Sequence, residues 1–158
     1  MQETGTEAPG CGGQAACAIR LILSSSRRFV LCVVQGDGCI ERLKDSLSAD
    51  ERDVFDATTR VWDLLLRNIN ERFILHSPDC PCISIHERAV LNGLRCLRSA
   101  GNTGYAAAMS VVLPPAAVRL IRPEMQDLAD ALMRLEGHYA QRINAAAVAA
   151  VQSSTYLH

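Results

Sequence analysis

The chain has 158 residues, of which 49% are hydrophobic, enough to bury the core of one domain. Its net charge of −1 argues against a protein that binds nucleic acids or anionic membranes through charge alone. The apolar runs are far shorter than the roughly 20 residues that cross a bilayer as a helix, so we expect no membrane-spanning segment.

The beginning of the chain and the cysteines predict a cellular location. Residues 1–13 are polar, Gly-rich and acidic, where an export signal would be basic and then apolar, and we expect them to form a disordered tail. The seven cysteines are odd in number, which argues against a framework in which every cysteine pairs. We therefore predict a cytoplasmic protein with reduced thiols.

The first ordered segment, residues 14–35, is strongly apolar. It is ambiguous between helix and strand, because Ser24–Ser26 interrupts the apolar pattern and Phe29–Val34 has a strand-like composition. We favour a helix, and a short strand pair near 18–34 is the alternative. A Gly-Asp-Gly turn then leads into a short helix over about 39–46.

Two later helices carry the same start signal, a capping box, in which a serine and the glutamate three residues on each satisfy a free backbone amide. The first is Ser48-Ala-Asp-Glu51, and the second, 36 residues later, is Ser84-Ile-His-Glu87. Apolar residues at intervals of three and four give each helix one buried face. These residues are Phe55, Thr58, Trp62, Leu65 and Ile69 in the first helix, and Val90, Leu91, Leu94 and Leu97 in the second.

The rest of the chain predicts further short helices. One is capped by Asn102 or Thr103, and Pro114-Pro115 opens a brief second one. Pro123 opens a third, which Gly137 ends as a C-terminal cap.

These elements together predict an all-α fold, a compact irregular bundle of six or seven short helices. We expect a single helical domain over residues 14–137. The Ala-rich residues 138–158 have little to bury and form either a weak final helix or a frayed tail.

One loop has the most chemically reactive composition in the sequence, His76-Ser-Pro-Asp-Cys-Pro-Cys-Ile-Ser-Ile-His86. It places two potential thiolates, Cys80 and Cys82, between two imidazoles, and such groups suit Zn²⁺ or another borderline-to-soft metal. Its two prolines restrict the backbone and lower the entropy lost on closing a chelate. The sequence therefore predicts a metal site made of His76, Cys80, Cys82 and His86, with zinc as the candidate ion.

Other interpretations of this loop stay open. Zinc patterns usually have two to four residues between paired cysteines, and here there is one. A Cys-Pro dipeptide can serve as an axial haem ligand, and two cysteines so close can act as a redox-active pair with a strained disulfide. The simplest alternative is a proline-rich connection whose thiols pack against the core and whose histidines cap a helix or face solvent.

No phosphate-binding loop, nucleophile elbow or metalloprotease motif is present in the sequence, so we predict no catalytic residue. By elimination we predict a small non-enzymatic regulatory or accessory protein that acts through protein–protein contacts, tuned by metal or redox state at loop 76–86. One rival is a protein that binds a metal or haem directly through the four residues above. Another is a DNA-binding regulator that uses the Arg-richer segment 88–122, although the charge does not favour nucleic acid. A homo-oligomer is compatible with the sequence.

Overall fold

The computed structural model describes residues 11–35, 39–69, 73–99 and 104–155, except the side chains of 11–17, 35, 39 and 147–155. Within these ranges the chain forms six helices and no strand, which confirms the predicted all-α fold. The helices are α1 (Cys11–Gln35), α2 (Cys39–Asp45), α3 (Ala49–Asn68), α4 (Ile85–Arg98), α5 (Tyr105–Met109) and α6 (Pro115–Thr155). The strand pair considered near 18–34 is not formed, because those residues lie within α1.

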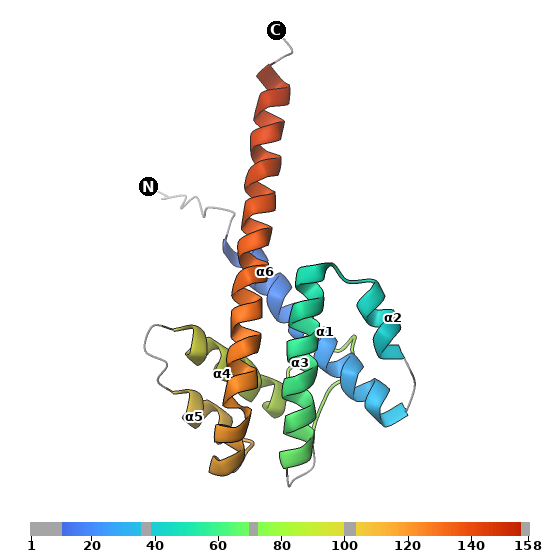
Figure 1. Cartoon of the computed structure of the whole chain (residues 1–158), viewed down its shortest axis with the longest axis vertical. Coiled ribbons are helices and arrows are strands. Elements are labelled where there is room, and N and C mark those ends of the chain that lie inside the picture. Colours follow the sequence, from blue (N-terminus) through green and yellow to red (C-terminus); the bar gives the residue numbers. More distant parts are fainter. Residues whose placement is uncertain (1–10, 36–38, 70–72, 100–103, 156–158) are drawn as a thin grey trace, which may run out of the picture.

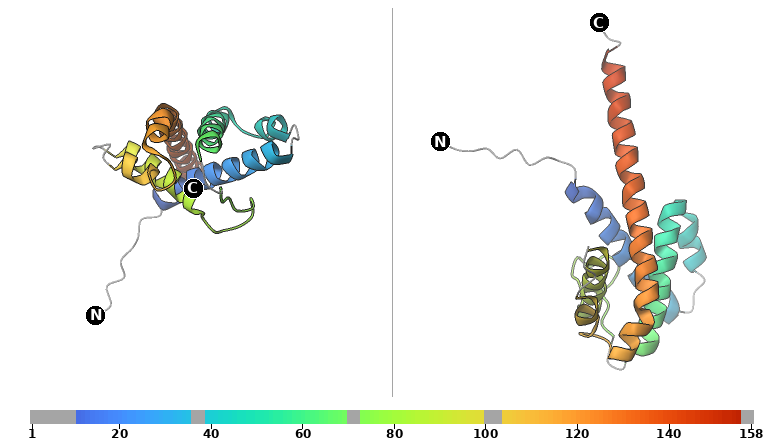
Figure 2. Two further views of the ribbon diagram at one scale, coloured as in Figure 1. Left: turned by 90° about the horizontal axis from the view of Figure 1, so that it is seen from below. Right: turned by 60° about the vertical axis from the view of Figure 1, so that its left-hand side comes forward.

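Two helices form the centre of the molecule. The first part of α6 packs beside α3, α1 contacts both, and α4 and α5 lie against α6 (Figures 1 and 2). Fully buried side chains, Trp62 and Leu65 of α3 and Leu128 and Leu132 of α6, belong to the core between them. The C-terminal part of α6 extends beyond the other helices, and its side chains over 141–146 are exposed (Figure 1).

The first helix continues through its run of serines because a hydroxyl bonds back to the helix itself. Ser26 Oγ donates to the carbonyl oxygens of Ile22 and Leu23, both at 2.9 Å. This local hydrogen bond satisfies a buried hydroxyl within the helix, which continues to Gln35. The serines therefore interrupt the apolar pattern of the sequence but not the helix.

Both predicted capping boxes are present. Ser48 Oγ accepts the N–H of Glu51 at 3.4 Å, and Glu51 Oε2 accepts the N–H of Ser48 at 2.9 Å. The equivalent bonds between Ser84 and Glu87 measure 3.2 and 2.7 Å. The starts of α3 and α4 are thus correctly predicted, as is the short helix α2.

The start of α5 is set by a glycine. Gly104 is the N-cap, at φ +94°, a left-handed conformation that glycine adopts without strain. The caps predicted at Asn102 or Thr103 lie outside the described residues.

The prediction of separate helices after Pro115 is wrong, because α6 is one helix of 41 residues that continues through Pro123, Gly137 and most of the predicted tail. A proline inside a helix removes one backbone hydrogen bond and crowds the preceding turn. Here Ile121 and Met125, on either side of Pro123, are fully buried, and this packing compensates for the defect. Neither α6 nor any other helix among the described residues is long and apolar enough to cross a membrane.

Replacing Gly137 with alanine tests the continuity of α6. In a continuous helix the change removes the entropic penalty of glycine, and it should stabilise the protein by about 0.5–1 kcal/mol in urea unfolding. If Gly137 instead ended a helix in the left-handed conformation, alanine there would destabilise the protein by about 1–2 kcal/mol.

Gly93→Ala in α4 is the matched control. A Cβ at Gly93 would lie 2.9 Å from Met109 Sδ and 3.0 Å from Met125 Cε, whereas nothing lies within 4 Å at Gly137. The buried methionines must shift to make room for the new methyl group. Gly93→Ala should therefore stabilise the protein less than Gly137→Ala does, or destabilise it. A loss of stability at Gly137 would contradict a continuous α6.

Candidate functional site

A buried arginine of α1 pairs with a buried glutamate of α4. The side chain of Arg27 is 3% exposed and that of Glu87 is 0% exposed. Arg27 Nε donates to Glu87 Oε1 at 2.5 Å, and Nη2 donates to Oε2 at 3.2 Å. This two-point contact is the geometry that a planar guanidinium and a carboxylate favour.

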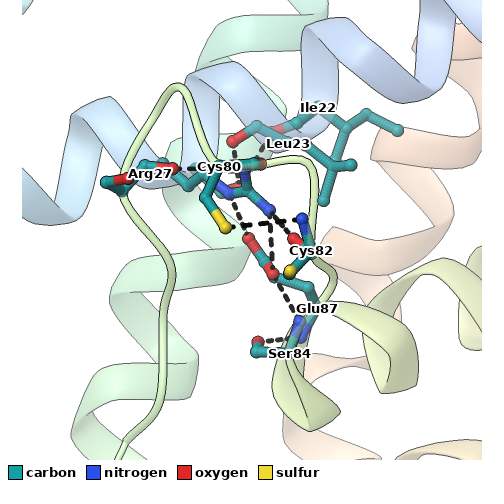
Figure 3. Close-up of polar contacts among 9 residues, drawn as sticks. Ile22, Leu23, Arg27, Cys80, Cys82, Ser84 and Glu87 are labelled. Atoms are coloured by element: carbon teal, nitrogen blue, oxygen red, sulfur yellow. Dashed lines mark hydrogen bonds and ion pairs between the residues drawn. The ribbon is translucent and has the colours of Figure 1, made fainter.

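The remaining N–H groups of Arg27 hold the loop between α3 and α4. Nη1 donates to the carbonyl oxygen of Cys80 and Nη2 donates to that of Cys82, each at 2.5 Å (Figure 3). Nη1 also donates to the carbonyl oxygen of Ser77 at 3.2 Å. A guanidinium has five N–H donors, so each of them is satisfied. We call Arg27, Glu87 and these three carbonyl groups the Arg27 cluster.

Glu87 serves the cluster and the helix cap at once. Its Oε2 also accepts the N–H of Ser84 at 2.7 Å. Burial raises the pKa of Glu87, but hydrogen bonds from Arg27 and from the Ser84 amide outweigh this effect and hold the pKa below its usual value. The carboxylate is therefore charged at neutral pH and engaged on both oxygens, which leaves it unsuited to act as a general base.

The loop held by the Arg27 cluster brings two of the predicted site residues together. Cys80 Sγ accepts the N–H of Cys82 at 3.4 Å, and Figure 3 shows the Cys80 sulfur directed toward Cys82. A side-chain hydrogen bond with Cys80 raises the pKa of the Cys82 thiol, and the Arg27 guanidinium opposes this more weakly. Cys82 is exposed, Cys80 is half-buried, and both are free thiols.

The two predicted histidines have different surroundings. His86 is buried in the first turn of α4, where its ring lies 4.8 Å from the ring of Phe73 and its Nδ1 accepts the N–H of Ile74 at 3.3 Å. Phe73 in turn meets Trp62 edge to face at 5.4 Å. His86 thus packs the loop against the core, while His76 is half-buried near the start of the loop.

The four predicted metal ligands are not gathered into one site. In the part of the chain that the structure describes, no group of three His, Cys, Asp or Glu side chains is placed to hold a metal ion. Cys80 and Cys82 are neighbours, but His86 is committed to packing and to a backbone amide. Structural zinc sites are almost always four-coordinate, so the two thiols offer half of such a set.

The prediction of reduced thiols is wrong for Cys32, which is buried in α1 and forms a disulfide bond. Its partner lies outside the described side chains. An odd number of cysteines argues against complete pairing, but it does not exclude a single bond between two of them. Cys80, Cys82 and Cys96 are free.

A second feature is an apolar groove of about 580 Å³ between α1, α4 and α6. Ile19 and Ile22 of α1, Leu91 of α4, and Leu132 and Met133 of α6 contribute to its lining. Ile19 and Met133 are 42% and 46% exposed, so the groove presents apolar surface to solvent.

Neither the burial of Arg27 nor the groove was predicted from the sequence. Arg27 lies in a mainly apolar segment that also holds Arg20 and Arg28, both of which are exposed, so the sequence does not mark which of these arginines is buried. Nothing local identifies the partner of Arg27, because the capping box alone accounts for a glutamate at position 87. The groove arises from three helices that are distant in the chain.

Replacing Arg27 with methionine tests the cluster. The change leaves Glu87 as an unpaired buried charge and should lower the free energy of unfolding by about 3–5 kcal/mol. Arg67→Met is the matched control, because it breaks an exposed pair with Asp63 and should lose less than about 1 kcal/mol. Equal losses at the two positions in urea unfolding would show that Arg27 has no special role.

The pH dependence of stability tests the charge of Glu87. Because its folded pKa is depressed, its contribution is present above the unfolded pKa of about 4.3 and is lost as the pH falls through the folded value. The stability difference between the wild type and Glu87→Gln should therefore stay constant from about pH 6 to 8 and shrink below about pH 4. A difference that grows on acidification would contradict this assignment.

Comparisons of the chain with protein-family models, with curated proteins and with solved structures find no match.

Proposed function

We propose that this chain is a non-enzymatic regulatory or accessory protein that binds an amphipathic helix of a partner protein in the groove between α1, α4 and α6. The observation that carries the proposal is the groove itself, with its open volume of about 580 Å³ and the exposed apolar side chains of Ile19 and Met133. An amphipathic helix binds such a groove by inserting apolar anchors spaced three and four residues apart. Apolar groups gathered in a concavity support binding more strongly than apolar groups scattered over a surface.

Charge at the edge of the groove gives the chemistry of the partner. Arg95 and Arg98 of α4 line it. Arg98 already pairs with Glu136 of α6, so Arg95 is the cation to be complemented. The partner helix should therefore have acidic residues beside its apolar anchors.

The DNA-binding alternative is less well supported. Of the five arginines in segment 88–122, Arg98 pairs with Glu136 and Arg122 lies over the ring of Tyr105, 5.5 Å from its centre. Arginines engaged within the protein are less available to phosphates, on which DNA affinity depends.

Other predictions from the sequence stay predictions. Zinc or haem binding by all four residues of loop 76–86 has support from only two of them, Cys80 and Cys82. Self-association is among these predictions. The disulfide bond of Cys32 weighs against the cytoplasmic location, because disulfides persist mainly in oxidising compartments.

Binding of designed helical peptides tests the proposal. The peptides have leucines spaced three and four residues apart and differ only in whether their flanking residues are glutamate or lysine. The acidic peptide should bind more tightly in fluorescence anisotropy, and Met133→Glu should weaken that binding by at least about tenfold, or 1.4 kcal/mol. Arg95→Glu should reduce the ratio between the affinity for the acidic peptide and the affinity for the lysine-flanked peptide.

Val111→Glu is the matched control. It places the same acidic group on another exposed apolar residue, 61% exposed and outside the groove lining, and should leave the affinity unchanged. Equal effects of Val111→Glu and Met133→Glu would contradict the groove as the binding site, as would failure of all the peptides to bind. Salt-dependent binding of a DNA duplex in place of the peptides would favour the DNA alternative.

A further inference from the structure

Cys80 and Cys82 form a pair of thiols on a loop whose backbone is held by hydrogen bonds. Arg27 binds the carbonyl oxygens of both residues, and the Cys80 N–H donates to the carbonyl of Ser77 at 3.0 Å. Pro78 and Pro81 restrict the backbone further. The two sulfurs are therefore held near each other before any ligand arrives, which lowers the entropy lost on chelation.

The number of ligands determines which metal ions suit this pair. Zinc prefers four ligands, and the described residues do not bring a third His, Cys, Asp or Glu to the two thiols. Thiolates are soft ligands that suit Cu(I), zinc and iron–sulfur clusters, and of these Cu(I) is the one that two thiolates satisfy. His86 is not needed for such a site and keeps its place against Phe73.

We propose that Cys80 and Cys82 form a two-thiolate site for a soft monovalent cation, of which Cu(I) is the representative. On binding, each S–H group loses its proton to water and each sulfur forms one bond to copper, which stays in the +1 state. The product carries one negative charge, made of two thiolates and one cation. The Arg27 guanidinium is within electrostatic reach of both sulfurs and favours this anionic product.

Proton release gives the site a pH dependence. Thiols bind metal ions as thiolates, so the metal must displace a proton from each sulfur. The affinity for Cu(I) should therefore rise as the pH is raised toward the thiol pKa. This site does not depend on the groove proposed above, so either proposal can fail without the other.

Anaerobic titration of the full chain with Cu(I), in competition with a chromophoric Cu(I) chelator, tests the proposal. Ascorbate keeps the copper monovalent. The expected result is about one equivalent bound per chain, with thiolate-to-copper absorption in the ultraviolet. Cys80→Ser and Cys82→Ser each remove one of the two ligands, and each should weaken binding by more than the roughly 10–100-fold that loss of a contact to a ligand costs.

Cys96→Ser is the matched control, since Cys96 is the other free thiol among the described side chains, is also half-buried and lies on α4 away from the loop. It should bind Cu(I) like the wild type. Circular dichroism melting of each variant separates loss of binding from loss of folding, and exposed Cys82 can be replaced with little effect on stability.

Three results would overturn the proposal. One is the absence of stoichiometric Cu(I) binding, and another is binding that survives in both Cys80→Ser and Cys82→Ser. The third is zinc bound in one equivalent and lost on His76→Ala or His86→Ala, which would restore the four-ligand site predicted from the sequence.

Discussion

The five hydrogen bonds donated by Arg27 connect α1, loop 77–82 and the first turn of α4, which are distant in sequence. An unpaired charge in the protein interior costs several kcal/mol, so any other arrangement that buries Arg27 is strongly disfavoured unless it supplies equivalent acceptors. The Arg27 cluster therefore fixes α4 relative to α1. The groove between α1, α4 and α6 and the thiol pair of the loop both depend on this placement.

Much of the helical framework could be predicted, because its signals are local. The capping boxes at Ser48 and Ser84 act over three residues, and both were found where the sequence places them. The prediction failed at Pro123 and Gly137, which act as helix-ending signals only where packing is weak. In α6, burial against α3 and α4 outweighs the tendency of Pro123 to end a helix. At Gly137 the helix continues because the neighbouring residues have high helix propensity.

The sequence indicated that prolines restrict the backbone of loop 76–86, and this is only part of the reason for its order. Two prolines and the cap at Ser84 restrict the backbone of the loop. The sequence cannot reveal that Arg27, 50 residues before Ser77, binds the carbonyl groups of the loop. The same limit explains His86. Its spacing from the cysteines suggested a ligand, whereas contact with Phe73 and the Ile74 amide turns it into a packing residue. Residue types and spacings indicate which chemistry is available, and long-range contacts decide which side chains remain free for it.

Amide hydrogen exchange in an Arg27→Lys variant tests the Arg27 cluster most directly. Lysine keeps the positive charge but has three donors on one atom and cannot reproduce the five bonds of the guanidinium. The N–H groups of Cys80 and Ser84 should then exchange at least about tenfold faster than in the wild type, which corresponds to 1.4 kcal/mol. The Ser48 amide in the equivalent cap of α3 should be unaffected. Unchanged exchange at Cys80 and Ser84 would contradict the assignment of loop order to Arg27.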